Sequence, residues 1–249
     1  MLSPSFLPSW QNQKFCELPK NFKSIDSHIL IAGFPKSGNV WLTSLVAGCL
    51  DLPVEKKDGH CFVHYTHKAL CDEWLYDRSL LRGVVIVRDL RDIIVSLFHW
   101  LKTDDYRNYH KHGPHQIFDD VETMYIEFFL RRFSKMPLVE LADSYVEKGW
   151  PVVKYERLFD NTVKELQRLF QVWGINVPIE KINLTVSMNT ISNIKNNGVI
   201  ESYTQPDHFR KGGYGQYLRE IPENILNDIE LRFGDYLMSW GYEIRNSIK

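Results

Sequence analysis

The chain has 249 residues, of which 44% are hydrophobic and 24% charged, and its 30 basic and 31 acidic residues give a formal net charge of -1. This composition is that of an ordinary globular protein, and its charge balance gives no reason to expect a nucleic-acid partner. A compact chain of this length buries roughly 70–75% of the surface that it exposes when unfolded, so one domain is the default expectation.

The first 26 residues are rich in proline and polar residues and predict a surface arm before a single domain over residues 27–249. They hold no basic stretch that leads into an apolar run, so no signal peptide is expected. No apolar run approaches the roughly 20 residues of a membrane helix, so a soluble protein without a membrane partner is expected. The four cysteines have no C-x-x-C spacing, which predicts free thiols in the reducing cytoplasm. These cysteines are Cys16, Cys49, Cys61 and Cys71. The oligomeric state stays open.

Strands and helices alternate along the rest of the chain. Residues 28–34 are a continuous apolar run that predicts a strand buried on both faces, and residues 40–50 carry apolar side chains at helical spacing. The pattern repeats with a strand at 83–87 and a helix that reaches Trp100. The remaining predicted elements are a strand at 150–155, a helix after it, and a last helix at 222–240. This alternation predicts an α/β fold with a parallel sheet flanked by helices and with ligands at the carboxyl ends of the strands.

The segment between the first predicted strand and helix, residues 33–41, has the sequence GFPKSGNVW. Glycines and consecutive backbone N–H groups at a helix N-terminus form an anion site, although an ordinary turn can have the same composition. The segment departs from the triphosphate loop G-x-x-x-x-G-K-[ST], because Asn39 and Val40 replace its Lys and Ser/Thr and the lysine is Lys36. Valine has no hydroxyl for Mg²⁺, so a magnesium site is disfavoured. Transfer of a sulfuryl group suits the loop, because this group carries less charge than a phosphoryl group and a lysine can replace the metal.

Three segments resemble motifs of the cytosolic sulfotransferase family, in the order that the family has them. Residues 34–41 resemble its loop P-K-S-G-T-T-W, residues 87–96 (VRDLRDIIVS) resemble V-R-N-P-R-D-x-x-V-S, and residues 209–215 (FRKGGYG) resemble R-K-G-x-x-G. The resemblance implies the sulfotransferase fold, with a P-loop-type parallel sheet. It also implies an enzyme that moves a sulfuryl group, without a metal, from 3′-phosphoadenosine 5′-phosphosulfate (PAPS) to a hydroxyl or amine of a small molecule. The product of the donor is adenosine 3′,5′-bisphosphate (PAP).

The same resemblance implies a set of donor-binding residues. Those at the 5′-phosphosulfate and the adenine are Lys36, Ser37, Gly38, Asn39, Val40, Trp41 and Tyr155. Those at the 3′-phosphate are Arg88, Ser96, Arg210, Lys211 and Gly212. These residue types suit their roles, because a guanidinium matches a phosphate and an aromatic face suits a purine. Alone, each arginine segment would more often be a solvated charge than a ligand, and core packing is the alternative for Trp41 and Tyr155. Only together with the loop do the segments predict two anion sites.

His67 is the predicted general base, because the segment HYTHK at residues 64–68 resembles the family's K-T-H-L-P. A neutral imidazole can take the proton of the acceptor as the new S–O bond forms. His64 is an alternative base three residues away. Lys36 is the second predicted catalytic residue, since its ammonium group can lie at the leaving oxygen.

Departures from the family motifs leave two other functions open. Tyr65 stands where many relatives have a second lysine, and Asn39 and Val40 replace two threonines. A catalytically silent protein that binds adenosine bisphosphate is consistent with these departures. An atypical P-loop nucleotide kinase is the other alternative, and it would need Mg²⁺ and ATP. Residues 218–223 do not resemble the family's dimer segment.

Two local clusters bear on metal binding and on the acceptor. Three histidines between residues 110 and 115 have metal-like spacing, but a Gly-Pro pair marks a loop and no Cys or carboxylate completes a set, so no metal is predicted. Residues 103–122 hold five acidic and two basic residues, a formal balance of -3. This acidity predicts a cationic acceptor, unless the acids only stabilise the start of a helix. The three histidines are His110, His112 and His115. The five acidic residues are Asp104, Asp105, Asp119, Asp120 and Glu122.

Overall fold

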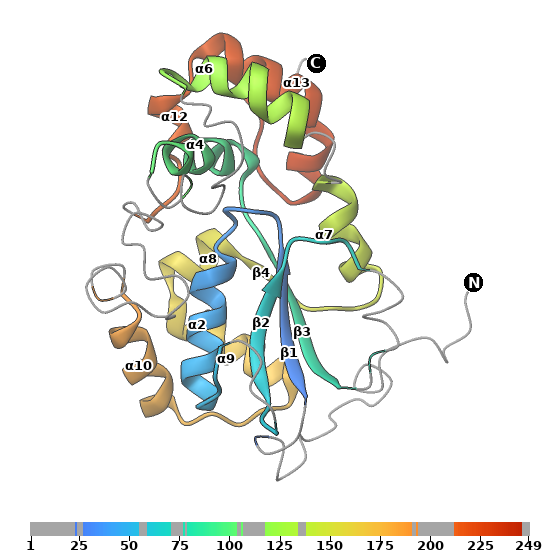
Figure 1. The fold of residues 1–249 in the computed structure, drawn as a ribbon, viewed down its shortest axis with the longest axis vertical. Helices are drawn as coiled ribbons and strands as arrows, with labels where there is room; N and C mark the ends of the chain where they lie inside the picture. The colour runs from blue at the N-terminus through green and yellow to red at the C-terminus, as the bar shows by residue number, and fades with distance from the viewer. Residues whose placement is uncertain are drawn as a thin grey trace. The chain divides into compact units, whose positions relative to one another are not determined.

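The computed structural model describes residues 23, 27–54, 59–70, 77, 79–103, 106, 118–133, 138–190, 193 and 212–245. The chain divides into two compact units, and Figure 1 labels helices and strands of both. The first unit comprises residues 1–87 and 140–194, and the second comprises residues 88–139 and 195–249. The single domain over residues 27–249 and the arm before it stay predictions.

A parallel sheet forms the centre of the first unit, and the described residues contribute four strands to it. The strands are β1 (His28–Gly33), β2 (Phe62–Thr66), β3 (Leu80–Val87) and β4 (Val152–Lys154). Their order across the sheet is β2-β1-β3-β4, and each neighbouring pair is parallel. All six residues of β1 are buried, as expected for an inner strand with an unbroken apolar sequence. The predicted α/β class with a parallel sheet is confirmed.

Helices pack against this sheet and against one another in the first unit. They are α2 (Asn39–Leu50), α7 (Leu138–Val146), α8 (Tyr155–Asp160), α9 (Thr162–Trp173) and α10 (Ile179–Met188). Leu45 of α2, Ile86 of β3 and Leu169 of α9 belong to one apolar core, and all are nearly or fully buried. α10 contacts both α2 and α9. The helical spacing of apolar residues in the sequence therefore marks the faces that form this core.

The second unit is helical in its described part. Its helices are α4 (Leu90–Leu101), α6 (Val121–Met124), the π-helix η3 (Tyr125–Phe133), α12 (Tyr217–Glu220) and α13 (Glu223–Ser239). α4 contacts α6, α12 and α13, and it buries apolar residues such as Ile94 and Leu97. The predicted last helix at 222–240 is confirmed.

Two elements differ from the sequence prediction. β2 was not predicted, because Val63 is its one fully buried residue and its sequence holds no unbroken apolar run. The strand predicted at 150–155 is only Val152–Lys154, and Tyr155 begins α8 instead. The aromatic ring of Tyr155 is therefore presented by the first turn of a helix.

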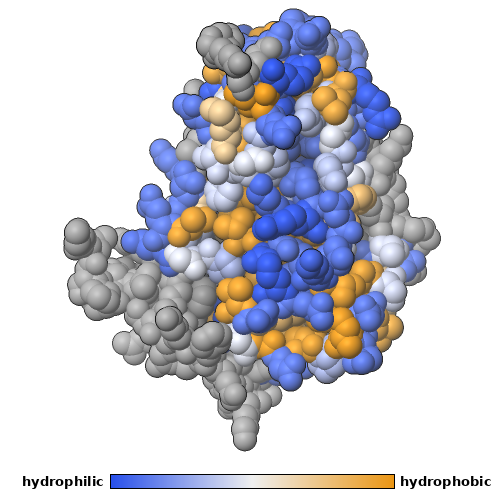
Figure 2. Space-filling view, turned by 180° about the vertical axis from the view of Figure 1, so that it is seen from behind, coloured by the Kyte–Doolittle hydropathy of each residue, from blue (hydrophilic) through white to orange (hydrophobic). Residues whose placement is uncertain are grey.

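Apolar residues also occur on the surface, where Figure 2 shows them in small groups between hydrophilic residues. Phe159, Leu184 and Leu231 are among the exposed large apolar residues. Scattered exposure of this kind is normal in folded proteins. Cys49 and Cys61 are buried and form no disulfide, and the other two cysteines lie outside the described residues. In the described part of the chain, no helix combines the length and the apolar character needed to cross a membrane.

Candidate functional site

The loop between β1 and α2 has the backbone conformation of an anion-binding turn. Lys36 and Gly38 are left-handed, with φ of 68° and 101°. The N–H of Ser37 donates to the carbonyl oxygen of Phe34 at 3.1 Å. A Cβ atom on Gly38 would lie 2.8 Å from Cδ2 of Tyr155. Glycine is therefore required at residue 38 both by its φ and by the close ring of Tyr155.

The N-terminus of α2 has no side-chain cap, so its first backbone N–H groups are available to a ligand. Its N-cap residue Gly38 makes no side-chain cap, and its first turn holds no acidic residue. The hydroxyl oxygen of Ser37 is buried and has no hydrogen-bond partner among the described residues. Buried hydroxyl groups are normally hydrogen-bonded, so an orphaned one beside a helix N-terminus indicates room for a ligand oxygen. These groups fit a phosphate or a sulfate.

Asn39 and Val40, the first two residues of α2, are both buried. Asn39 donates from Nδ2 to the carbonyl oxygen of Phe34 at 2.8 Å, so its amide closes the loop from within. Val40 is 7% exposed and packs in the interior. The turn thus keeps its backbone N–H groups, while it lacks the two threonine hydroxyl groups of the family motif.

His67 contacts the same loop. Its Nδ1 lies 2.7 Å from the carbonyl oxygen of Gly33, the last residue of β1. A carbonyl oxygen can only accept, so Nδ1 carries the proton of this hydrogen bond. In the neutral ring, Nε2 is then the basic nitrogen. The contact therefore selects the tautomer in which Nε2 can accept a proton.

Helix α7 braces the chain directly after His67. The hydroxyl of Tyr145 donates to the carbonyl oxygen of Lys68 at 3.0 Å, and the N–H of Leu70 donates to Oγ of Ser144 at 2.9 Å. Tyr145 is fully buried, so water does not compete for its hydrogen bond. The sequence carries no signal for these contacts, because Ser and Tyr are ordinary residues in a helix.

His64, the alternative base, lies among other rings of the sheet. Its ring centroid is 4.8 Å from that of His28 and 5.3 Å from that of Phe62. Burial, followed by the charge of His28, lowers the pKa of His64 to about 4. A base with such a pKa is poorly matched to neutral pH.

Trp41, Tyr155 and Phe159 form an aromatic cluster in the first unit. The centroid of Tyr155 is 5.9 Å from that of Trp41 and 6.2 Å from that of Phe159, on which it stacks. The indole N–H of Trp41 donates to the carbonyl oxygen of Asn189 at 3.2 Å. Phe159 is 41% exposed and was not predicted as a site residue. Its spacing of four residues from Tyr155 on one helix face is the signal that could have revealed it.

Arg88 and the glycine turn meet in the second unit. Arg88 is buried, and its Nη2 donates to the carbonyl oxygen of Gly213 at 3.0 Å. Gly212 and Gly213 have φ of 68° and 90°, which glycine adopts without strain. The structure therefore brings together two of the motifs, although 125 positions separate these residues in the chain. Ser96 lies on α4 and is partly buried, whereas Arg210 and Lys211 lie outside the described residues.

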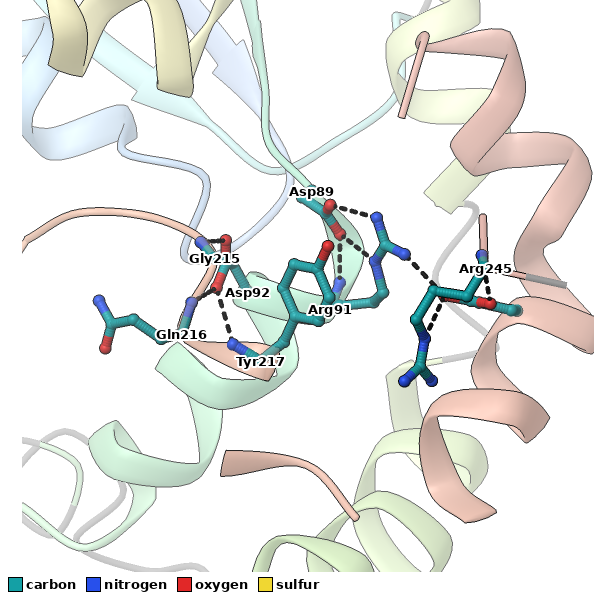
Figure 3. Close-up of polar contacts among 8 residues, drawn as sticks. Asp89, Arg91, Asp92, Gly215, Gln216, Tyr217 and Arg245 are labelled. Carbon is teal, nitrogen blue, oxygen red and sulfur yellow. Dashed lines mark hydrogen bonds and ion pairs between the residues drawn. The ribbon is translucent and has the colours of Figure 1, made fainter. Parts of the chain in front are cut away.

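A buried ion-pair network, which the sequence did not reveal, follows Arg88 (Figure 3). The Arg91 guanidinium donates to both carboxylate oxygens of Asp89, at 3.0 and 2.7 Å, and to Glu230 at 2.7 Å. It also lies 4.3 Å from the ring centroid of Tyr217. Burial opposes its charge, but the hydrogen bonds and charge of Asp89 outweigh burial and raise the pKa of Arg91. This network joins α4 to α12 and α13.

Two local clusters of the sequence bear on metal binding and on the acceptor. No set of three or more His, Cys, Asp or Glu side chains suited to a metal ion occurs among the described residues, and the histidines at 110, 112 and 115 lie outside them. In the acidic segment, Asp120 caps α6 by accepting from the N–H of Thr123 at 2.7 Å. This hydrogen bond lowers the pKa of Asp120. Part of the acidic charge therefore stabilises a helix start, as the alternative reading of that segment expects.

Residues 58–241, about three quarters of the chain, match the family described as the sulfotransferase domain. The match begins after the loop at residues 34–41, and it includes both later motifs, at residues 87–96 and 209–215. No curated protein matches the sequence.

Solved structures with the same fold include sulfotransferases bound to PAP. Mouse sulfotransferase SULT7A1 complexed with PAP is 18% identical, with a TM-score of 0.62 over 91% of this chain and 87% of the other. A retinol dehydratase with androsterone and the inactive cofactor PAP is 16% identical, with a TM-score of 0.63 over 92% and 85%. A retinol dehydratase with retinol and PAP is 15% identical, with a TM-score of 0.65 over 91% and 85%. At these identities the similarity establishes the fold, and the predicted fold family is confirmed.

Proposed function

Because this chain belongs to the sulfotransferase domain family, we propose that it transfers a sulfuryl group from PAPS to a hydroxyl or amine of a small molecule, with His67 as general base. The observation that carries this proposal is the 2.7 Å hydrogen bond between Nδ1 of His67 and the carbonyl oxygen of Gly33. It holds a histidine, with Nε2 as its basic nitrogen, against the loop that suits an anion.

The loop at residues 34–41 is proposed to bind the 5′-phosphosulfate of the donor. The backbone N–H groups at the start of α2 and the orphaned hydroxyl of Ser37 support this assignment. Lys36 supplies a cation in the same turn, and its left-handed backbone is the kind of local strain that occurs at ligand sites. Trp41 and Tyr155 are proposed to contact the adenine, since they are aromatic and lie in one cluster with an exposed ring.

The second unit is proposed to bind the 3′-phosphate. Arg88 and Gly212 belong to motifs that the structure joins through the hydrogen bond of Arg88 to Gly213. Ser96, Arg210 and Lys211 are assigned to the same phosphate by their positions in the family motifs. A donor phosphorylated at both the 3′ and the 5′ ends matches the two anion-binding sets.

In the proposed reaction, the acceptor attacks sulfur as the bond from sulfur to the 5′-phosphate oxygen breaks. Nε2 of His67 takes the proton of the attacking hydroxyl or amine, so the acceptor becomes an anionic sulfate ester or sulfamate whose bridging oxygen or nitrogen carries no positive charge. Lys36 and the backbone N–H groups stabilise the charge that develops on the leaving phosphate oxygen, and PAP departs. Each of these residues acts as a proton acceptor or a charge, so the scheme needs no metal ligand.

Calorimetry with PAP in excess EDTA, followed by mass spectrometry of products from PAPS and an acceptor panel, tests this function. We expect PAP to bind equally well with and without EDTA, because the proposed ligands are cations, N–H groups and hydroxyls. We expect a sulfated product from at least one acceptor. Tight PAP binding without any product would favour a catalytically silent protein. Magnesium-dependent ATP binding without affinity for PAP would favour a nucleotide kinase.

The acceptor is proposed to be a small cationic molecule. Residues 103–122 carry a formal balance of -3, although the capping role of Asp120 accounts for part of it. A segment with this negative charge attracts cations and repels anions before contact, and salt screens this attraction. We therefore expect amine- or guanidinium-bearing alcohols to have higher kcat/KM than neutral phenols and steroids, with an advantage that shrinks as salt rises.

Replacing Asp104 and Asp105 with asparagine is the matched test of the cationic acceptor. The double variant should lose part of the preference for cationic alcohols and keep its rate with neutral ones. A preference for neutral apolar acceptors that this double variant leaves unchanged would contradict the proposal.

A further inference from the structure

Asp92 makes an unusual set of hydrogen bonds to the turn after the glycine motif. Its carboxylate accepts from the backbone N–H groups of Gly215 at 2.6 Å, Gln216 at 2.8 Å and Tyr217 at 3.3 Å. Figure 3 shows these three groups converging on the Asp92 carboxylate. Asp92 lies in the first turn of α4, more than 120 positions before its partners. One side chain thus holds three consecutive residues of a distant segment.

The held segment has little conformational preference of its own. Gly212, Gly213 and Gly215 all have positive φ, and a Cβ atom on Gly215 would meet nothing within 4 Å. Gly215 is therefore needed for its backbone conformation and not for space. Glycines lose more freedom on folding than other residues, so a glycine turn keeps one conformation only if outside contacts hold it.

Other contacts hold the rest of the turn and join α4 to α12, the helix that follows the turn. Arg88 donates to the carbonyl oxygen of Gly213 at 3.0 Å. The side-chain amide of Gln216 donates to the carbonyl oxygen of Gly212 at 2.8 Å. His99, near the end of α4, pairs with Glu220 at the end of α12. Of these contacts, only that of Asp92 joins an ionised acceptor to several backbone donors, and such bonds are roughly twice as strong as neutral ones.

The electrostatics of Asp92 also need an explanation. Burial raises the pKa of the Asp92 carboxyl, and the charge of Arg88 and the N–H of Gly215 only partly offset this effect. A carboxylate is thus kept, partly dehydrated, beside the arginine that is proposed to bind a phosphate. By charge alone this residue would oppose the binding of an anion.

We propose that Asp92 is a positioning residue for the 3′-phosphate: by holding the N–H groups of residues 215–217, it keeps the glycine turn and Arg88 in the arrangement that receives this phosphate. The inference rests on the function proposed above. In this proposal Asp92 does not contact the nucleotide. Asp92 affects binding only because it holds Gly212 and Arg88 in place.

The test compares Asp92→Ala and Asp92→Asn with the unsubstituted protein, and Asp228→Asn serves as the matched control. Asp228 is a carboxylate of the same unit that accepts hydrogen bonds from Tyr125 and Arg232 and touches no glycine of the turn. Calorimetry gives the Kd of PAP and of adenosine 5′-phosphosulfate, which lacks the 3′-phosphate. Amide hydrogen exchange of residues 212–217 without nucleotide reports directly on the turn.

We expect Asp92→Ala to raise the Kd of PAP about 10- to 100-fold, the size of one or more lost charge-assisted hydrogen bonds, with little change for adenosine 5′-phosphosulfate. Asp92→Asn should have a smaller effect, because its single carbonyl oxygen can keep Gln216 and Tyr217 but turns an NH₂ group toward Gly215. Both variants should speed exchange in the turn, and Asp228→Asn should change neither measurement. If Asp92→Ala does not fold, Asp92→Asn carries the comparison.

The sign of the effect separates positioning from charge. Tighter PAP binding by the Asp92 variants would mean that the carboxylate acts only as a nearby negative charge, and it would overturn the inference. Equal losses for the two nucleotides, or the same loss in Asp228→Asn, would overturn it as well. If the unsubstituted protein binds no PAP, the proposed function fails too, so that outcome differs from a failure of the inference alone.

Discussion

Replacing His67 with alanine is expected to lower kcat about 10²–10⁴-fold while the Kd of PAP stays the same, as for the loss of proton transfer alone. The reason lies in the hydrogen bond of Nδ1 to the carbonyl oxygen of Gly33, which leaves Nε2 as the basic nitrogen. Alanine removes that nitrogen and leaves the N–H groups at the start of α2 in place. Single-turnover rates with PAPS, together with calorimetric binding of PAP, measure the two effects separately.

His64→Ala is the control for this prediction. The ring of His64 packs beside those of His28 and Phe62, and its pKa is lowered to about 4, so its loss should leave proton transfer intact. A large fall in kcat for His64→Ala with none for His67→Ala would mean that the base is assigned three residues too late. A loss of PAP binding in His67→Ala would instead indicate that His67 mainly supports the loop.

Replacing Arg91 with methionine is expected to lower the free energy of unfolding by about 3–5 kcal/mol, the usual cost of removing one partner from a buried ion pair. Asp89 and Glu230 are 6% and 5% exposed, and they would lose the cation that both contact at 2.7 Å. Methionine keeps much of the side-chain volume, so the change reports mainly on charge. Urea denaturation at neutral pH gives the free energy and its m-value.

Arg232→Met is the control for the Arg91 prediction, because it removes an arginine that pairs with Asp228 on the exposed side of α13. Exposed pairs contribute little to stability, so this variant should unfold almost like the unsubstituted protein. A similarly small effect in Arg91→Met would show that water reaches the network and screens it. A changed m-value would point to an altered unfolded or native state instead of a lost ion pair.

Local patterns in the sequence were sufficient for the fold class, and they also marked the segments that are proposed to form the site. The unbroken apolar run at 28–34 predicted a buried strand, and the glycine and lysine loop after it predicted an anion-binding turn. Both predictions depend on residues close together in the chain, where propensity and spacing carry the information. The segment 64–68 also suggested a general base, but it holds two histidines, His64 and His67, and residue type alone does not distinguish them.

Other features depend on residues that are far apart in the chain. β2 has one fully buried residue, so its sequence holds no apolar run that would predict a strand. The hydrogen bonds of Asp92 and Arg91 reach more than 120 positions along the chain, and a charged residue that is solvated has the same local sequence as one that is buried.

The sequence by itself determined the chemistry that this protein can offer: a parallel α/β core, a glycine turn with a lysine, arginines for a phosphate and a histidine for a proton. The tertiary structure decided which of these groups meet and in which state. It gave His67 a carbonyl partner that sets its tautomer, buried His64 beside another histidine, and turned Asp92 toward three backbone N–H groups. The physical reason is that tautomer, pKa and hydrogen-bond partner depend on burial and on neighbours in space, whereas the order of residues specifies only which groups are available.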